Sequence, residues 1–195
     1  MMPRIVLPII AAALLTGCAS LPAPRIYVLD PPGAGASPVV SLRDRPPVAL
    51  LPVVVPDYLD TTDILLRGDG HEIVARESGR WGERLSVGVT HALASALQAR
   101  RPDLGIASAA VVDDRPRRLL VHIDALDTWP DGRCALTARW TLLDSDGQTV
   151  LASLAARFSI PAAAMPTPGD ADIVDSVSRI VGELAQTIAA SLPRT

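Results

Sequence analysis

Apolar side chains recur every three or four residues in two long stretches of the chain, which is the period of an amphipathic helix. The first stretch predicts a helix from an N-cap at Ser78 to about Arg101, with Trp81 heading its apolar face. Arg100 and Arg101 would place positive charge at the C-terminal end of this helix, where the helix dipole favours it. The second stretch predicts a helix over residues 170–192.

Shorter runs have the composition or the alternation of β-strands. Residues 25–29 form an isolated β-prone run, and residues 48–55 form a continuous apolar run typical of a central strand, with a bulge or an edge position expected at Pro52. The other runs are 64–67 and 72–76, which flank a Gly-rich turn, 104–112, 118–126, and the hairpin of 135–143 with 149–158. Together these elements predict a single α/β (α+β) domain, in which a largely antiparallel sheet of about six strands packs against two amphipathic helices.

The start of the chain has the organisation of a bacterial lipoprotein export signal. Arg4 precedes an apolar run that is too short to span a bilayer, and small residues then lead to Cys18. Cys18 is therefore predicted to be the lipid anchor; the alternative is an ordinary secretory signal with a cysteine at its cleavage site. We expect a signal peptide over residues 1–17, a Pro/Gly/Ala-rich tether over 18–47 and a periplasmic α/β domain over 48–195.

The residue after Cys18 indicates which membrane the protein is attached to. Ala19 replaces the aspartate that retains many lipoproteins at the inner membrane, so we expect the periplasmic face of the outer membrane, with the inner membrane as the alternative. If the strand at 25–29 pairs with the main sheet, the tether has about seven residues and spans at most roughly 25 Å. If it does not pair, a tether of about thirty residues reaches much further.

Composition limits the classes of function. Hydrophobic residues make up 49% of the chain, which is enough for a core without metals or disulfides. The net charge of −3 provides no basic surplus for nucleic acid, so we expect no nucleic-acid partner. With Cys18 acylated, Cys134 has no partner in the chain and is interpreted as a small packed residue. A homo-oligomer is compatible with this composition.

Few residues have the pattern of a catalytic or metal site. His122 and Asp124 alternate with apolar residues, so a base and its orienting carboxylate could share the polar face of a strand, although solvated strand positions explain them equally. Asp144, Asp146 and Gly147 resemble the opening of a calcium loop, but the later ligands are missing and a hairpin turn accounts for them. We therefore expect no catalytic residue, no cofactor and no metal.

One loop has the pattern of a partner-binding site. The apolar run that ends at residue 55 continues directly into a Pro-Asp turn, which would place Tyr58 and Leu59 at an exposed tip. The alternative is that Tyr58 folds back over the core. Glu83 lies off the apolar face of the first helix and could pair with an arginine such as Arg67. The candidate partner-binding residues are Pro56, Asp57, Tyr58, Leu59 and Arg67.

Several short motifs occur in a fixed order along the mature chain. They are the lipobox ending in Cys18, Tyr27-x-Leu29, Val53-x-Val55-Pro56-x-Tyr58-Leu59-Asp60 followed by Arg67, Arg80-Trp81-x-Glu83-x-Leu85, and Leu136-x-Ala138-x-Trp140. With these motifs the chain resembles the ABC-type transport auxiliary lipoproteins, although Thr61-Thr62 replaces the Arg-Pro or similar pair that often follows the aspartate in that family.

The resemblance implies a membrane-anchored accessory or docking component of an MCE-type ABC or related intermembrane lipid transport system. The implied partner is an MCE-domain protein, and lipid movement would be driven by other components. Two other functions remain open on the residues alone: a periplasmic hydrolase that uses His122 and Asp124, and a structural envelope lipoprotein. The transported molecule is not encoded in any of these motifs.

Overall fold

The computed structural model describes residues 23–30, 45–108, 115–163 and 168–193, so Cys18 lies outside the described residues. No helix in these ranges is long and apolar enough to cross a membrane. The elements are β1 (Arg25–Tyr27), β2 (Pro47–Leu50), the 3-10 turn η1 (Asp57–Leu59), β3 (Asp63–Arg67), β4 (Ile73–Trp81), α2 (Leu85–Arg100), β5 (Gly105–Ser108), β6 (Arg117–Thr128), β7 (Cys134–Leu143), β8 (Val150–Ile160) and α3 (Asp170–Ser191).

The strands form two mixed sheets. A three-stranded sheet has the order β1-β4-β3, and a five-stranded sheet has the order β5-β2-β6-β7-β8. The long strands β6, β7 and β8 pair antiparallel, whereas β2 pairs parallel with both β5 and β6, and β1 pairs parallel with β4. The α+β class is as predicted, with eight strands in the described residues where about six were expected.

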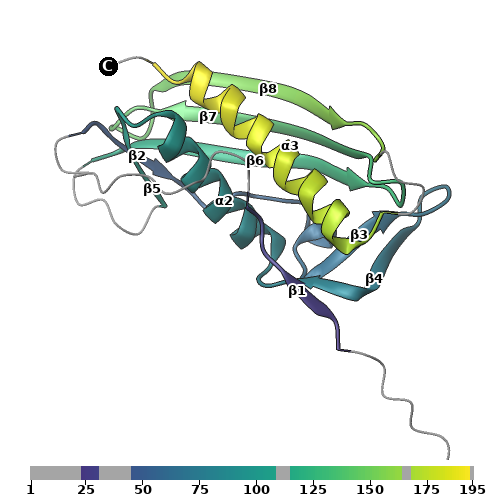
Figure 1. Ribbon diagram of the computed structural model, residues 1–195. Coiled ribbons are helices and arrows are strands. Elements are labelled where there is room, and N and C mark those ends of the chain that lie inside the picture. The colour runs from purple at the N-terminus through teal and green to yellow at the C-terminus, as the bar shows by residue number, and fades with distance from the viewer. Residues whose placement is uncertain (1–22, 31–44, 109–114, 164–167, 194–195) are drawn as a thin grey trace, which may run out of the picture.

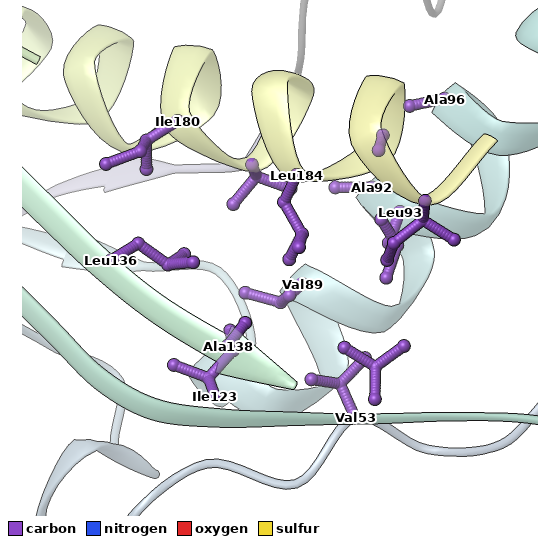
Figure 2. Close-up of a cluster of buried hydrophobic side chains, with 14 of the residues drawn as sticks. Val53, Val89, Ala92, Leu93, Ala96, Ile123, Leu136, Ala138, Ile180 and Leu184 are labelled. Carbon is purple, nitrogen blue, oxygen red and sulfur yellow. The ribbon is translucent and has the colours of Figure 1, made fainter. Parts of the chain in front are cut away.

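The main core lies between the two helices and the five-stranded sheet. Both helices cover the same face of that sheet, with α3 running across β7 and β8 (Figure 1). Side chains of α2 and α3 meet those of the sheet in this layer, and they include Val89, Leu93, Ile180, Leu184 and Leu136 (Figure 2). Ile173, Ile180 and Leu184 of the predicted apolar face of α3 are fully buried.

The first helix begins later than its apolar pattern predicted. Residues 73–81 form β4, and the helix starts at Leu85. Trp81 is buried as expected, but as the last residue of a strand, where it pairs with Tyr27 and donates its N–H to the carbonyl of Thr62 at 2.7 Å. A Cβ at the buried Gly79 would lie 2.7 Å from an oxygen of Asp170, so any other residue here would require Asp170 or the strand to shift.

The predicted strand 48–55 is interrupted at the proline. Regular pairing ends at Leu50, because Pro52 has no N–H to donate to a ladder. The chain returns to the sheet at Val54, which forms an isolated bridge with His122 and donates its N–H to the carbonyl of Val121 at 3.0 Å. The predicted strand 104–112 is seen as β5, and its residues 109–112 lie outside the described residues.

Both predicted hairpins are confirmed, since β3 pairs antiparallel with β4 and β7 pairs antiparallel with β8. In the second turn Gly147 has a φ of 71°, a conformation that glycine adopts readily. The Asp146 carboxylate accepts hydrogen bonds from the Thr149 hydroxyl and from the backbone N–H groups of Gln148 and Thr149, which lowers its pKa to about 2. Asp146 therefore closes a hairpin turn, as the turn interpretation predicted.

Candidate partner-binding surface

The segment after Val55 forms a single 3-10 turn. Leu59 donates its N–H to the carbonyl of Pro56 at 2.9 Å, and Asp60 donates to the carbonyl of Asp57 at 3.2 Å. This turn separates the two side chains that were expected at its tip. Tyr58 is 46% exposed, whereas Leu59 is 5% exposed and belongs to the core. The expectation that Leu59 is an exposed anchor is therefore wrong, because the turn directs its side chain inward.

Asp60 fixes the turn to the start of α2. Its carboxylate accepts the backbone N–H of Ser86 at 3.1 Å and lies 3.3 Å from the guanidinium of Arg84. The hydrogen bonds from Ser86 and the nearby Arg84 charge lower the pKa of Asp60, against the effect of its burial. Since no side chain at the N-cap position bonds to the first turn of α2, this carboxylate satisfies one of the free N–H groups there.

Thr61 and Thr62 hold the turn mainly through their backbone carbonyls. The carbonyl of Thr61 accepts the N–H of Leu85 at 3.2 Å, and the carbonyl of Thr62 accepts that of Trp81. Main-chain contacts of this kind do not depend on the side chain. The two carbonyl contacts are therefore independent of the departure from the family pattern, whereas the Thr61 hydroxyl adds side-chain bonds, accepting the N–H of Asp63 at 3.2 Å and donating to its carboxylate at 3.3 Å.

Arg67, at the end of β3, joins the two sheets. Its Nε lies 2.6 Å from Oδ1 of Asp127 on β6. The hydrogen bond to Asp127 raises the pKa of Arg67, and the nearby Tyr58 phenol adds a smaller effect in the same direction. Arg67 is partly exposed and Tyr58 is exposed, so both side chains are accessible to a partner. The Glu83–Arg67 pair suggested by the sequence is not formed, because Glu83 contacts His91 of α2 at 3.2 Å.

Four of the five predicted site residues therefore reach the surface: Asp57 and Tyr58 are exposed, and Pro56 and Arg67 are partly exposed. We call Pro56, Asp57, Tyr58 and Arg67 the Tyr58 surface. Sequence reasoning missed Asp127, which holds Arg67 in place. The available signal was an aspartate near the end of an otherwise mostly apolar strand, but its partner lies 60 residues away along the chain.

The residues that suggested catalysis have other partners. The Asp124 carboxylate lies 2.9 Å from the guanidinium of Arg139, and Arg139 is also the cross-strand neighbour of His122. Cys134 is fully buried and its pKa is raised to about 12, mainly by that burial, so it is a packed thiol. Within the described ranges, no three His, Cys, Asp or Glu side chains are grouped to hold a metal ion.

The sequence matches the family described as ABC-type transport auxiliary lipoprotein component over residues 27–189. The chain belongs to this family. As a member, it is a lipoprotein of the cell envelope and an auxiliary component of transport, and the family is not an enzyme class. No curated protein matches the sequence of this auxiliary lipoprotein.

Two solved structures share the fold of this auxiliary lipoprotein. One is the crystal structure of an uncharacterized protein, with 19% identity and a TM-score of 0.67 over 88% of this chain and 99% of that one. The other is protein XCC0632 from Xanthomonas campestris, with 15% identity and a TM-score of 0.59 over 84% of this chain and 92% of that one. At these identities the likeness shows the fold alone.

Proposed function

We propose that this lipoprotein is the docking component of an MCE-type intermembrane lipid transport system. In this proposal acyl chains on Cys18 hold it at the periplasmic face of the outer membrane, and the Tyr58 surface binds an MCE-domain protein. Lipid is moved by the partner system, and the α+β domain provides a fixed point of attachment at the membrane.

The observation that carries the proposal is the position of Tyr58 on a turn that is fixed on both sides. Leu59 holds the turn in the core, and Asp60 holds it against α2 through Ser86. Tyr58 remains 46% exposed, and Arg67 is partly exposed. Tyrosine and arginine dominate binding energy at protein interfaces, and a side chain that is already held in place loses less conformational entropy on binding.

The position of β1 supports a docking role close to a membrane. Because β1 pairs with β4 from residue 25, the chain between Cys18 and the folded domain has about seven residues and spans at most roughly 25 Å. The acylated cysteine of a lipoprotein carries more than one chain, which gives stable rather than reversible anchoring. A domain held on so short a tether is well placed to hold a partner complex at the membrane.

The proposal is tested by Tyr58→Ala in the full lipoprotein. We expect weaker recovery of the MCE-domain protein from solubilised envelopes, by about 2 kcal/mol of binding free energy or roughly thirtyfold, because truncated aromatic anchors commonly cost this much. The melting temperature should stay unchanged, since the side chain is half exposed. Val74→Ala is a matched control, because Val74 is also 46% exposed and lies on β4.

Each outcome of this experiment separates the candidate functions. Undiminished recovery of the partner by a stable Tyr58→Ala protein would refute the Tyr58 surface as the docking site. Failure of the wild-type lipoprotein to recover any MCE-domain protein would favour a structural envelope lipoprotein. A drop in melting temperature for Tyr58→Ala would show that the tyrosine contributes to the core.

A further inference from the structure

The edge strand β8 (Val150–Ile160) is unusual for the free edge of a sheet. It has 11 residues, and no strand within the described residues pairs with its outer side. The other sheet edges in those residues are much shorter: β5 has four residues, β1 has three and β3 has five. Folded proteins normally keep edge strands short or guard them with charged residues or prolines, because a long free edge is ready to pair with another chain.

From Ala152 onward, β8 has none of the features that usually prevent a free edge from pairing. Its one charged residue is Arg157, and the Nε of Arg157 donates to the Thr137 hydroxyl of β7 at 3.4 Å, away from the free edge. A bulge lies opposite Leu143, at the Val150 end of the strand. From Ala152 onward the pairing with β7 is regular, so the outer side of the strand presents a straight ladder of backbone groups.

The strand also has apolar side chains that are exposed. Ala152, Leu154 and Ala156 pair with residues of β7 that are buried under the helices, so these three side chains lie on the same face of the sheet. Leu154 is nevertheless 43% exposed, and Val150 and Leu151 are exposed as well. β8 forms the outer margin of the five-stranded sheet (Figure 1). The core-facing row of the sheet thus continues to an uncovered margin.

We propose that β8 is an interface between two copies of this chain, which pair edge to edge in antiparallel orientation with Leu154 opposite Leu154 of the second copy. The row around this residue reads the same in both directions, because a leucine is flanked by an alanine on each side. In this register Ala152 faces Ala156 of the other copy. The five-stranded sheet would then continue across the two-fold axis as a ten-stranded sheet.

Charge favours the antiparallel register over a parallel pairing of the two copies. In the register centred on Leu154, Arg157 lies opposite Leu151 of the other copy, so the only charged side chains of the two strands do not face each other. Parallel pairing in register would instead place the two arginines side by side. Leu154, which is exposed in a single copy, would be covered by Leu154 of the second copy, and each copy offers the same Ala-Leu-Ala row.

The experiment is disulfide trapping in the full lipoprotein, in its own envelope. Directly opposed residues of antiparallel strands have Cα atoms about 4.5–5.5 Å apart, which is within the range for a disulfide. Leu154→Cys should therefore convert most of the protein to a disulfide-linked dimer under mild oxidation. The native Cys134 does not interfere because it is fully buried.

Two controls define the register. Ser153→Cys lies next along the same strand but faces Ala155 of the second copy, and Val74→Cys is an equally accessible position on β4. Each should give less than about a tenth of the dimer formed by Leu154→Cys, because neither places two cysteines opposite each other. In addition, Leu154→Arg should abolish the dimer detected by chemical cross-linking, while circular dichroism should still show a folded domain, since the side chain is 43% exposed in a single copy.

Three results would overturn the proposal. A dimer maximum at Ser153→Cys or Ala155→Cys would show that the register is different. A Leu154→Cys protein that stays monomeric and reacts freely with a water-soluble maleimide would show that the edge is uncovered. A Leu154→Cys protein that is shielded from the maleimide in the envelope, without forming its own disulfide, would show that a different protein occupies β8.

Discussion

The C-terminal end of α3 depends on an arginine from the other helix, and this dependence can be measured. Arg101 follows the last residue of α2, and its guanidinium donates hydrogen bonds to the carbonyls of Ala189, Leu192 and Pro193 at 3.2, 2.9 and 2.8 Å. Asp103 holds the guanidinium in place at 2.6 Å. Arg101 was expected to interact with the C-terminal end of α2, but its side chain binds carbonyls at the C-terminal end of α3 instead.

The stability that Arg101 contributes follows from the backbone N–H donors that these carbonyls lack. The carbonyl of Ala189 would accept the N–H of residue 193 in a continuing helix, but Pro193 has none. Hydrogen bonds to charged groups contribute about 1.5–3 kcal/mol each, although water replaces part of this at exposed positions such as Pro193. The Arg101 side chain is only 12% exposed, so we expect Arg101→Ala to lower the free energy of unfolding by about 2–4 kcal/mol.

Thermal melts of the purified lipoprotein in mild detergent measure this loss. For a domain of this size, roughly 2–4 °C of melting temperature corresponds to each kcal/mol, so Arg101→Ala should melt about 5–15 °C lower. The melting temperature of Arg101→Lys should lie between those of Arg101→Ala and the wild type. An ammonium keeps the positive charge but cannot reach three carbonyls as the planar guanidinium does. Arg179→Ala, at an exposed position of α3, is the matched control and should change stability by less than about 0.5 kcal/mol. If Arg101→Ala and Arg179→Ala melt together, the capping argument is wrong.

Two further predictions concern the anchor and the turn. Cys18→Ala should abolish incorporation of a palmitate analogue and release the protein from the membrane fraction, and equal labelling of the mutant would contradict the anchor. Asp60→Asn should destabilise the domain by about 1 kcal/mol at neutral pH, because it weakens the bond to Ser86 at the start of α2. Since the pKa of Asp60 is lowered in the fold, its stabilisation is present above the ordinary value of 3.8 and is lost as pH falls below it. The difference in stability between wild type and mutant should therefore shrink once the pH falls below about 3.8, and a difference that stays constant down to the lowest pH at which the domain is folded would count against the assignment.

Local patterns predicted the elements whose partners are close in sequence. The β7–β8 hairpin and the helix over 170–191 both follow from alternation, turn residues and apolar spacing within one window. The division of the strands into two sheets was not predicted, because it depends on parallel pairs between distant segments. The pairing of Arg25–Tyr27 with β4 is one such pair.

The error at the start of α2 has the same origin. Trp81 and Leu85 are four residues apart, a spacing that fits one face of a helix. Trp81 is nevertheless the end of a strand, since its neighbours in space are Tyr27 and the carbonyl of Thr62. Nothing within the window 78–101 indicates these contacts, so the tertiary pairing overrides the local pattern.

The charged residues show most clearly that local sequence does not predict tertiary partners. Their partners also show which residues of the candidate site stabilise the fold. Arg67 was assigned from its neighbours in sequence to a docking loop, and the partners of Asp60 and Asp170 were not predicted. In the structure Arg67 binds Asp127, Asp60 binds Ser86, and the buried Asp170 pairs with Arg76. Such residues hold elements together, so their replacement should lower stability as well as binding. Tyr58 contributes to the pKa of Arg67 only weakly and remains half exposed, and its replacement should therefore lower binding alone.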